Sequence, residues 1–139
     1  MNVFVDASGW LALSNRQDRM HRAAVAALER LRRDGVFLVT TTWTANEALS
    51  ILKRRIGPEQ AKQLWARLNN PRLVELVSID AATEGDALGL FFGYDDKRWG
   101  VVDCASLVVM ERTGCLQALG FDEHFVEAGL QRGFTVIGG

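Results

Sequence analysis

Short apolar runs alternate with longer amphipathic stretches along the whole chain. Val3–Val5, Val36–Thr41 and Leu73–Ile79 have the length and apolar, β-branched content of strands, and helical patterns separate them. A repeated strand–helix order favours parallel strands with helices on both faces. The sequence therefore predicts an α/β fold: a three-layer α/β/α domain with a central parallel β-sheet.

The remaining elements are placed by periodicity and by their end signals. Gly57-Pro58 divides two helices, because glycine often follows a helix and proline often opens one. The expected helices are Ala7–Ser14, Met20–Arg33, Thr44–Ile56, Pro58–Asn69, Asp80–Phe92 and Asp103–Arg112, with a helical turn at Glu123–Gly129. Two further strands are expected at Ala118–Phe121 and Phe134–Ile137.

Length and composition agree with one globular domain over residues 1–139. The longest stretch without a charged residue, Gly35–Asn46, is shorter than the ~20 apolar residues of a membrane-spanning helix. The N-terminus lacks the basic segment of a signal peptide. The two cysteines, Cys104 and Cys115, make neither a disulfide framework nor a zinc-ligand spacing. We therefore expect a cytosolic protein without a membrane segment.

The overall charge restricts how the chain could bind nucleic acid. Sixteen basic and seventeen acidic residues give a net charge of −1, whereas general nucleic-acid binders are usually basic. If four acids served a metal site, the remaining charge would be 16 − 13 = +3. RNA or DNA therefore stays possible as a substrate, bound through local basic patches.

Four acids lie where strands end or helices begin: Asp6, Glu47, Asp103 and Asp122. Each has a structural explanation, because carboxylates at helix starts accept hydrogen bonds from free N–H groups. Glu47 in particular fits a capping box with Thr44. Taken singly, capping is the simpler interpretation of each acid.

Together the acids predict more than caps. In a parallel sheet the carboxyl ends of the strands and the starts of the following helices share one edge, where ligands bind. Carboxylates that converge there raise one another's pKa, and a hard divalent cation such as Mg²⁺ or Mn²⁺ relieves their repulsion. Asp80 also follows a strand and opens a helix, so only strand order can separate it from the other acids.

Four segments in order resemble the PIN domain family, and most closely the VapC-type toxin ribonucleases of toxin–antitoxin pairs. They are Val3-Phe4-Val5-Asp6-Ala7-Ser8, Asn46-Glu47-Ala48-Leu49, Val102-Asp103-Cys104-Ala105-Ser106 and Gly120-Phe121-Asp122-Glu123-His124-Phe125, the last followed by Ala128-Gly129 and Gly133-Phe134. The resemblance covers nearly the whole chain. It implies a sheet with the first strand central between the second and fourth, which would bring the four acids together and leave Asp80 at the edge.

The resemblance also implies a function. The chain is expected to be a metal-dependent endoribonuclease in which Asp6, Glu47 and Asp103 hold one Mg²⁺ or Mn²⁺ and Asp122 supports that ion or a second one. The implied substrate is structured RNA, a tRNA or an rRNA loop, and the implied partners are a cognate antitoxin and a second copy of the chain. Relatives often carry Ser or Thr where this chain has Gly100, so a hydroxyl near the metal is missing here.

Several other residues are functional candidates or can be excluded. Arg54, Arg55, Lys97 and Arg98 are the basic side chains best placed for a phosphate backbone, and His124 could position a phosphate. Cys104 lies in an apolar helix and is expected to be a core residue. Gly-x-Ser-x-Gly, Walker A and Gly-x-Gly-x-x-Gly motifs are absent from the sequence.

Two alternatives remain open. The chain could be a PIN nuclease that processes RNA without an antitoxin, which the neighbouring genes would reveal. It could instead be a receiver-like module that binds Mg²⁺ without cutting RNA. A receiver needs an adjacent acid pair after the first strand, and Asp6 is followed by Ala7-Ser8.

Overall fold

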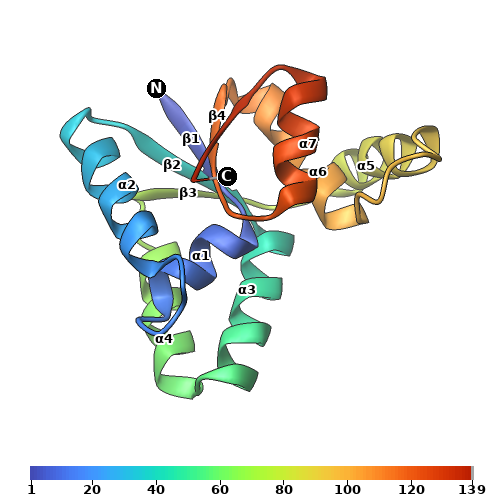
Figure 1. The fold of residues 1–139 in the computed structure, drawn as a ribbon. Helices are drawn as coiled ribbons and strands as arrows, with labels where there is room; N and C mark the ends of the chain where they lie inside the picture. The colour runs from blue at the N-terminus through green and yellow to red at the C-terminus, as the bar shows by residue number, and fades with distance from the viewer. Residues whose placement is uncertain (139) are drawn as a thin grey trace.

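The structure, a computed structural model, describes residues 1–138, in which five strands form one parallel sheet (Figure 1). The strand order is β3-β2-β1-β4-β5. The strands are β1 (Asn2–Val5), β2 (Phe37–Thr41), β3 (Val74–Val77), β4 (Gln117–Leu119) and β5 (Thr135–Ile137). The predicted parallel sheet is confirmed, with β1 in its centre and β3 at one edge.

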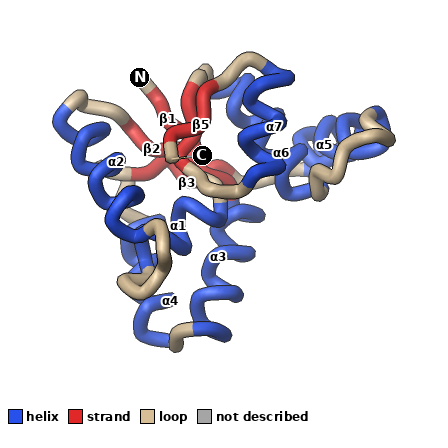
Figure 2. Tube along the Cα trace, in the orientation of Figure 1, coloured by secondary structure: helices blue, strands red, loops and turns tan. Residues whose placement is uncertain are grey.

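Among the described residues, seven helices cover the two faces of this sheet, which Figure 2 shows between two helical groups. On one face lie α1 (Ala7–Ser14), α2 (His21–Arg33), α3 (Thr42–Arg55) and α4 (Pro58–Leu68). On the other face lie α5 (Ala81–Gly93), α6 (Val101–Thr113) and α7 (Glu123–Arg132). Within residues 1–138, every helix is too short or too polar to span a lipid bilayer.

The central strand shows how the sequence builds the two cores. Successive side chains of a strand point to opposite faces, so Val3 and Val5 pack with the first helical group and Phe4 packs with the second. All three side chains are fully buried. A strand buried on both faces has to be continuously apolar, which is what the opening run of the sequence shows.

Four helices start directly at the carboxyl edge of the sheet. Asp6, Thr41, Asp80 and Asp122 are the N-cap residues of α1, α3, α5 and α7, and each side chain accepts a backbone N–H of the first turn. The acids that follow strands β1, β3 and β4 therefore do cap helices, as the simpler interpretation predicted.

Three expectations about helix ends are wrong. Thr41 caps α3, so Glu47 lies in the second turn of the helix and forms no capping box with Thr44. Helix α6 begins at Val101, so Asp103 lies inside its first turn. The short turn expected after Asp122 is a helix of ten residues, because it continues to Gly133, whose left-handed backbone (φ 83°) ends it.

Candidate active site

Asp6 is the most buried acid at the carboxyl edge of the sheet. Its side chain is 7% exposed, and one oxygen, Oδ1, accepts hydrogen bonds from the Gly9 N–H (2.9 Å) and the Ser8 hydroxyl (2.7 Å). The pKa of Asp6 is raised to about 7, chiefly by burial and to a smaller extent by the Asp122 and Asp103 carboxylates, while these two hydrogen bonds act in the opposite direction. A charge on Asp6 is therefore unfavourable unless a cation compensates it.

The loop between β4 and α7 lies directly against this carboxylate. A Cβ atom on Gly120 would stand 2.5 Å from the carboxyl group of Asp6, so only glycine fits there. The next residue, Phe121, donates its backbone N–H to the Ser8 hydroxyl at 2.8 Å. These two close approaches bring Asp122, at the end of the loop, towards Asp6.

Asp103 lies in the first turn of α6, where its Oδ2 accepts the Gly100 N–H at 3.0 Å. Burial raises its pKa, this hydrogen bond lowers it, and the Asp122 carboxylate raises it. His124, on α7, acts on Asp103 in the opposite sense and lowers its pKa. The third predicted acid is thus electrostatically connected to the fourth, although 19 residues separate them.

Glu47 projects from the second turn of α3. The residue is exposed as a whole, yet neighbouring atoms cover part of its carboxyl group and raise its pKa. The charges of Asp103 and Asp122 add to this increase. Helices α3 and α6 are held together one turn away, where the buried hydroxyls of Thr44 and Ser106 are 3.2 Å apart.

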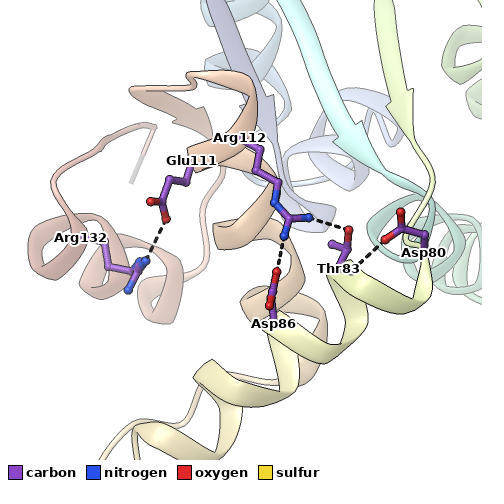
Figure 3. A network of polar contacts seen from close by, with 6 residues as sticks. All are labelled: Asp80, Thr83, Asp86, Glu111, Arg112 and Arg132. Atoms are coloured by element: carbon purple, nitrogen blue, oxygen red, sulfur yellow. Dashed lines mark hydrogen bonds and ion pairs between the residues drawn. The ribbon is translucent and has the colours of Figure 1, made fainter.

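All four predicted acids therefore share one electrostatic field, although Asp6 follows β1 and the other three lie on α3, on α6 and at the end of the loop before α7. Asp80 does not belong to this field. Hydrogen bonds from Thr83 lower its pKa, and Arg112 lowers it further. Figure 3 shows that Asp80 and Arg112 both contact Thr83 and that Arg112 also pairs with Asp86, in a network between α5 and α6.

The four acids do not form a closed ligand cage. Within residues 1–138, no three Asp, Glu, His or Cys side chains are arranged to bind one ion directly. The donor set nevertheless fits a hard cation, because Mg²⁺ prefers oxygen ligands, takes one or two carboxylates and keeps several waters. The fit rests on Asp6, because burial and, to a smaller extent, the Asp122 and Asp103 charges disfavour its ionised form, and a bound cation would stabilise that form.

The structure changes the interpretation of some other candidates. Lys97 pairs with Glu127 (3.0 Å) and Asp96 (3.6 Å), so its ammonium group is already engaged by carboxylates. Arg54, Arg55 and Arg98 are exposed. Cys104 is buried and its thiol pKa is raised by burial, which agrees with a core residue and not with a nucleophile.

Two residues matter for the site that the sequence did not assign a role. Ser8 links Asp6 to the loop before α7, and Gly120 makes room for the Asp6 carboxylate. Both lie inside the segments that resemble the PIN family. Their roles depend on contacts between residues more than 110 positions apart, so local sequence carries no signal for them.

Comparison with known proteins identifies the fold and related proteins. The PIN domain family profile matches residues 3–130. The 23S rRNA-specific endonuclease VapC20 of Mycobacterium tuberculosis is 30% identical over 128 residues, which cover 91% of this chain and 94% of VapC20. The crystal structure of VapC20, described as a sarcin–ricin-loop cleaving toxin, aligns with a TM-score of 0.80 over 91% of this chain and 95% of that one.

Two more distant structures share the fold. VapBC2 from Rickettsia felis, bound to a DNA fragment from its promoter, aligns with a TM-score of 0.71 at 10% identity, over 98% of this chain and 97% of that one. FitAcB from Neisseria gonorrhoeae aligns with a TM-score of 0.61 at 16% identity, over 99% and 96% of the two chains.

Proposed function

Because the chain belongs to the PIN domain family, we propose that it is a Mg²⁺- or Mn²⁺-dependent endoribonuclease that hydrolyses a phosphodiester bond in structured RNA. The observation that carries this proposal is the group of four carboxylates from separate elements, three of which have raised pKa values because they are buried near one another. Helix capping alone does not explain why these acids converge.

Asp6, Glu47, Asp103 and Asp122 are the residues that would hold the cation, directly or through water. When bound, a divalent cation supplies a more acidic water molecule and stabilises the charge that develops on the phosphate. Asp6 is kept in one orientation by Ser8 and Gly9. Asp103 or Asp122 would accept the proton of the attacking water. As the water oxygen bonds to phosphorus, the bond from phosphorus to the 3′-oxygen breaks and that oxygen takes up a proton from solvent, which leaves a 5′-phosphate and a 3′-hydroxyl.

We further propose ribosomal RNA as the substrate. VapC20 is named for its action on 23S rRNA, and its 30% identity extends over almost the whole of both chains. A tRNA is the alternative that the resemblance left open. A ribosomal substrate places the activity in the cytoplasm, and the toxin description of VapC20 supports a cognate antitoxin as the inhibitory partner.

The two competing functions are less well supported. A receiver-like module needs an adjacent pair of acids after the first strand. This chain does not have that pair, because Asp6 is followed by Ala7-Ser8. An RNA-processing nuclease without an antitoxin shares the same site, so it differs in gene neighbourhood and in substrate. A small gene for a DNA-binding protein directly upstream would favour the toxin.

The outer face of α5 supports a homodimer. This face carries Gly85, Leu88, Gly89 and Phe92, with Leu88 38% and Phe92 70% exposed. Cβ atoms on the two glycines would meet only open space, and an exposed apolar patch commonly marks a protein–protein contact. A second copy of α5 can approach such a small-residue surface closely, in a two-fold interface that buries the same face of both chains.

The oligomeric state is tested by light scattering after gel filtration. Phe92→Glu should convert a dimer into a monomer, whereas Leu130→Glu, which changes a still more exposed apolar side chain (85%) on α7, should leave the dimer intact. A wild-type protein that is monomeric at the same concentration would refute the interface.

The catalytic proposal is tested with a transcript that contains the sarcin–ricin loop of 23S rRNA. Wild-type protein should cut it at one position in Mn²⁺ or Mg²⁺ and leave it intact in EDTA, and end-mapping should show 5′-phosphate ends. Folded protein that cuts neither this transcript nor total tRNA, with either ion present, would refute the proposed activity.

A further inference from the structure

Ser8 makes two hydrogen bonds that join separate parts of the site. Its Oγ donates to Oδ1 of Asp6 at 2.7 Å and accepts the backbone N–H of Phe121 at 2.8 Å. The first bond spans two residues and the second spans 113. One side chain thus connects the end of the central strand β1 with the loop that leads into α7.

This connection restrains the loop before α7, which repulsion between two carboxylates would move away from Asp6. The carboxylates of Asp6 and Asp122 repel one another when both are charged. The loop before α7 is held on its other side by the Gly120 N–H, which donates to the Ile137 carbonyl at 3.2 Å. On the side of Asp6, the hydrogen bond from Phe121 to Ser8 holds the loop in place.

We propose that Ser8 is a positioning residue that ties the carboxylate of Asp6 to the loop carrying Asp122, and thereby sets the separation of the two acids for binding a divalent cation. This inference rests on the proposed metal-dependent function. Groups that hold a metal ligand through a hydrogen bond commonly change metal affinity 10–100-fold when they are removed. Ser8 has this position relative to Asp6, and it also reaches the segment of a second acid.

The first test uses the metal-free protein and needs no enzymatic activity. In Ser8→Ala, hydrogen exchange at the Phe121 amide should become about tenfold faster, because that N–H loses its acceptor. Ser8→Thr keeps a hydroxyl and should retain slow exchange. Ser14→Ala, at the last residue of the same helix and similarly half-buried, is the matched control and should leave the Phe121 amide unchanged.

The second test measures Mn²⁺ affinity by calorimetry and the Mn²⁺ concentration needed for half-maximal RNA cleavage. Ser8→Ala should weaken both about tenfold, with the rate at saturating Mn²⁺ within about twofold of wild type, and Ser8→Thr should restore both. A role limited to capping α1 would lower the melting temperature without changing the Mn²⁺ requirement.

The outcomes separate this inference from the proposed function. Ser8→Ala with unchanged Mn²⁺ affinity, or with unchanged Phe121 exchange, overturns the role of Ser8 even if the wild type is an active nuclease. Wild-type protein that binds Mn²⁺ but cuts no RNA refutes the nuclease and leaves the role of Ser8 supported by the two variants. Wild-type protein that binds no Mn²⁺ refutes both.

Discussion

Asp6 and Asp80 have the same local structure at two places in the sheet. Each follows a parallel strand, and their backbones are nearly identical, with φ −83° and ψ 177° at Asp6 and φ −85° and ψ 176° at Asp80. Each carboxylate accepts the N–H three residues later, at 2.9 Å from Gly9 and 2.8 Å from Thr83. By every local criterion, both are helix caps.

Their electrostatic properties are nevertheless opposite. Asp6 follows the central strand, is buried near two other carboxylates, and has a pKa raised to about 7. Asp80 follows the edge strand β3, is exposed, and has a pKa lowered by Thr83 and, to a lesser extent, Arg112. The position of a strand in the sheet, and not the cap itself, decides whether an acid becomes part of a candidate site.

The largest expected difference between the two regions is in catalysis. Asp103→Asn, Asp6→Asn and Glu47→Gln should each lower the rate of metal-dependent RNA cleavage by about 10²–10⁴-fold, as expected when a positioned acid that binds the cation or accepts a proton is removed. Asp80→Asn should stay near wild type. Cleavage assays at fixed Mn²⁺ measure these rates. An equal loss of rate in Asp80→Asn would contradict the distinction between Asp80 and the site acids.

The second prediction concerns the stability of the metal-free protein against pH. The folded state favours protonated Asp6, with a pKa of about 7 against an ordinary 3.8, so the free energy of unfolding should decrease as pH rises from about 4 to about 7. The contribution of Asp6 alone is about 4 kcal/mol. Urea unfolding in EDTA across this range measures the decrease, and Asp6→Asn should largely remove it.

Asp80 supplies the control with the opposite sign. Its lowered pKa stabilises the fold above the ordinary value of 3.8, and this contribution is lost as pH falls towards the lowered pKa. Asp80→Asn should therefore change the slope of the profile only at its acidic end. If both variants altered the same pH range, burial at the central strand would not be the cause.

The third prediction separates repulsion from capping at Asp103. The side-chain oxygen of asparagine can still accept the Gly100 N–H, so Asp103→Asn removes the charge and keeps much of the hydrogen bonding. Because burial and Asp122 disfavour the charged form, this variant should melt a few degrees higher than wild type in EDTA. A lower melting temperature would instead favour a purely structural acid.

Addition of metal should reverse that order. Millimolar Mn²⁺ should raise the melting temperature of the wild type through binding to the folded state, and should raise that of Asp103→Asn much less. Thermal melts of both proteins with and without Mn²⁺ give the four melting temperatures that this comparison needs. A wild type whose melting temperature does not respond to Mn²⁺ would contradict the candidate metal site.

The smallest expected effect is the loss of the cap at the edge strand. Asp80→Ala removes the acceptor of the Thr83 N–H and should lower the melting temperature slightly, with the same shift in EDTA and in Mn²⁺. The absence of any metal dependence is the informative result. A shift in melting temperature that depended on Mn²⁺ would mean that Asp80 interacts with the metal site of the four acids.

The sequence by itself was sufficient to predict the parallel α/β sheet and the caps formed by Asp6, Asp80 and Asp122. Periodicity and capping are local properties, since they depend on residues within a few positions of one another. The sequence was a less reliable guide to where α3 and α6 begin. Thr41 rather than Thr44 caps α3, and α6 begins at Val101 rather than at Asp103. Several neighbouring residues can begin a helix, and packing selects among them.

The resemblance to a family, and not the residues alone, predicted that β1 lies between β2 and β4 and that Asp80 stays apart. Strand order is decided by which strands pair across the sheet, and no periodicity along the chain encodes it. Only the tertiary structure brings Gly120 against the Asp6 carboxylate and the Phe121 N–H to Ser8. Burial and repulsion act through space, so the pKa that distinguishes Asp6 from Asp80 arises only after distant parts of the chain have packed together.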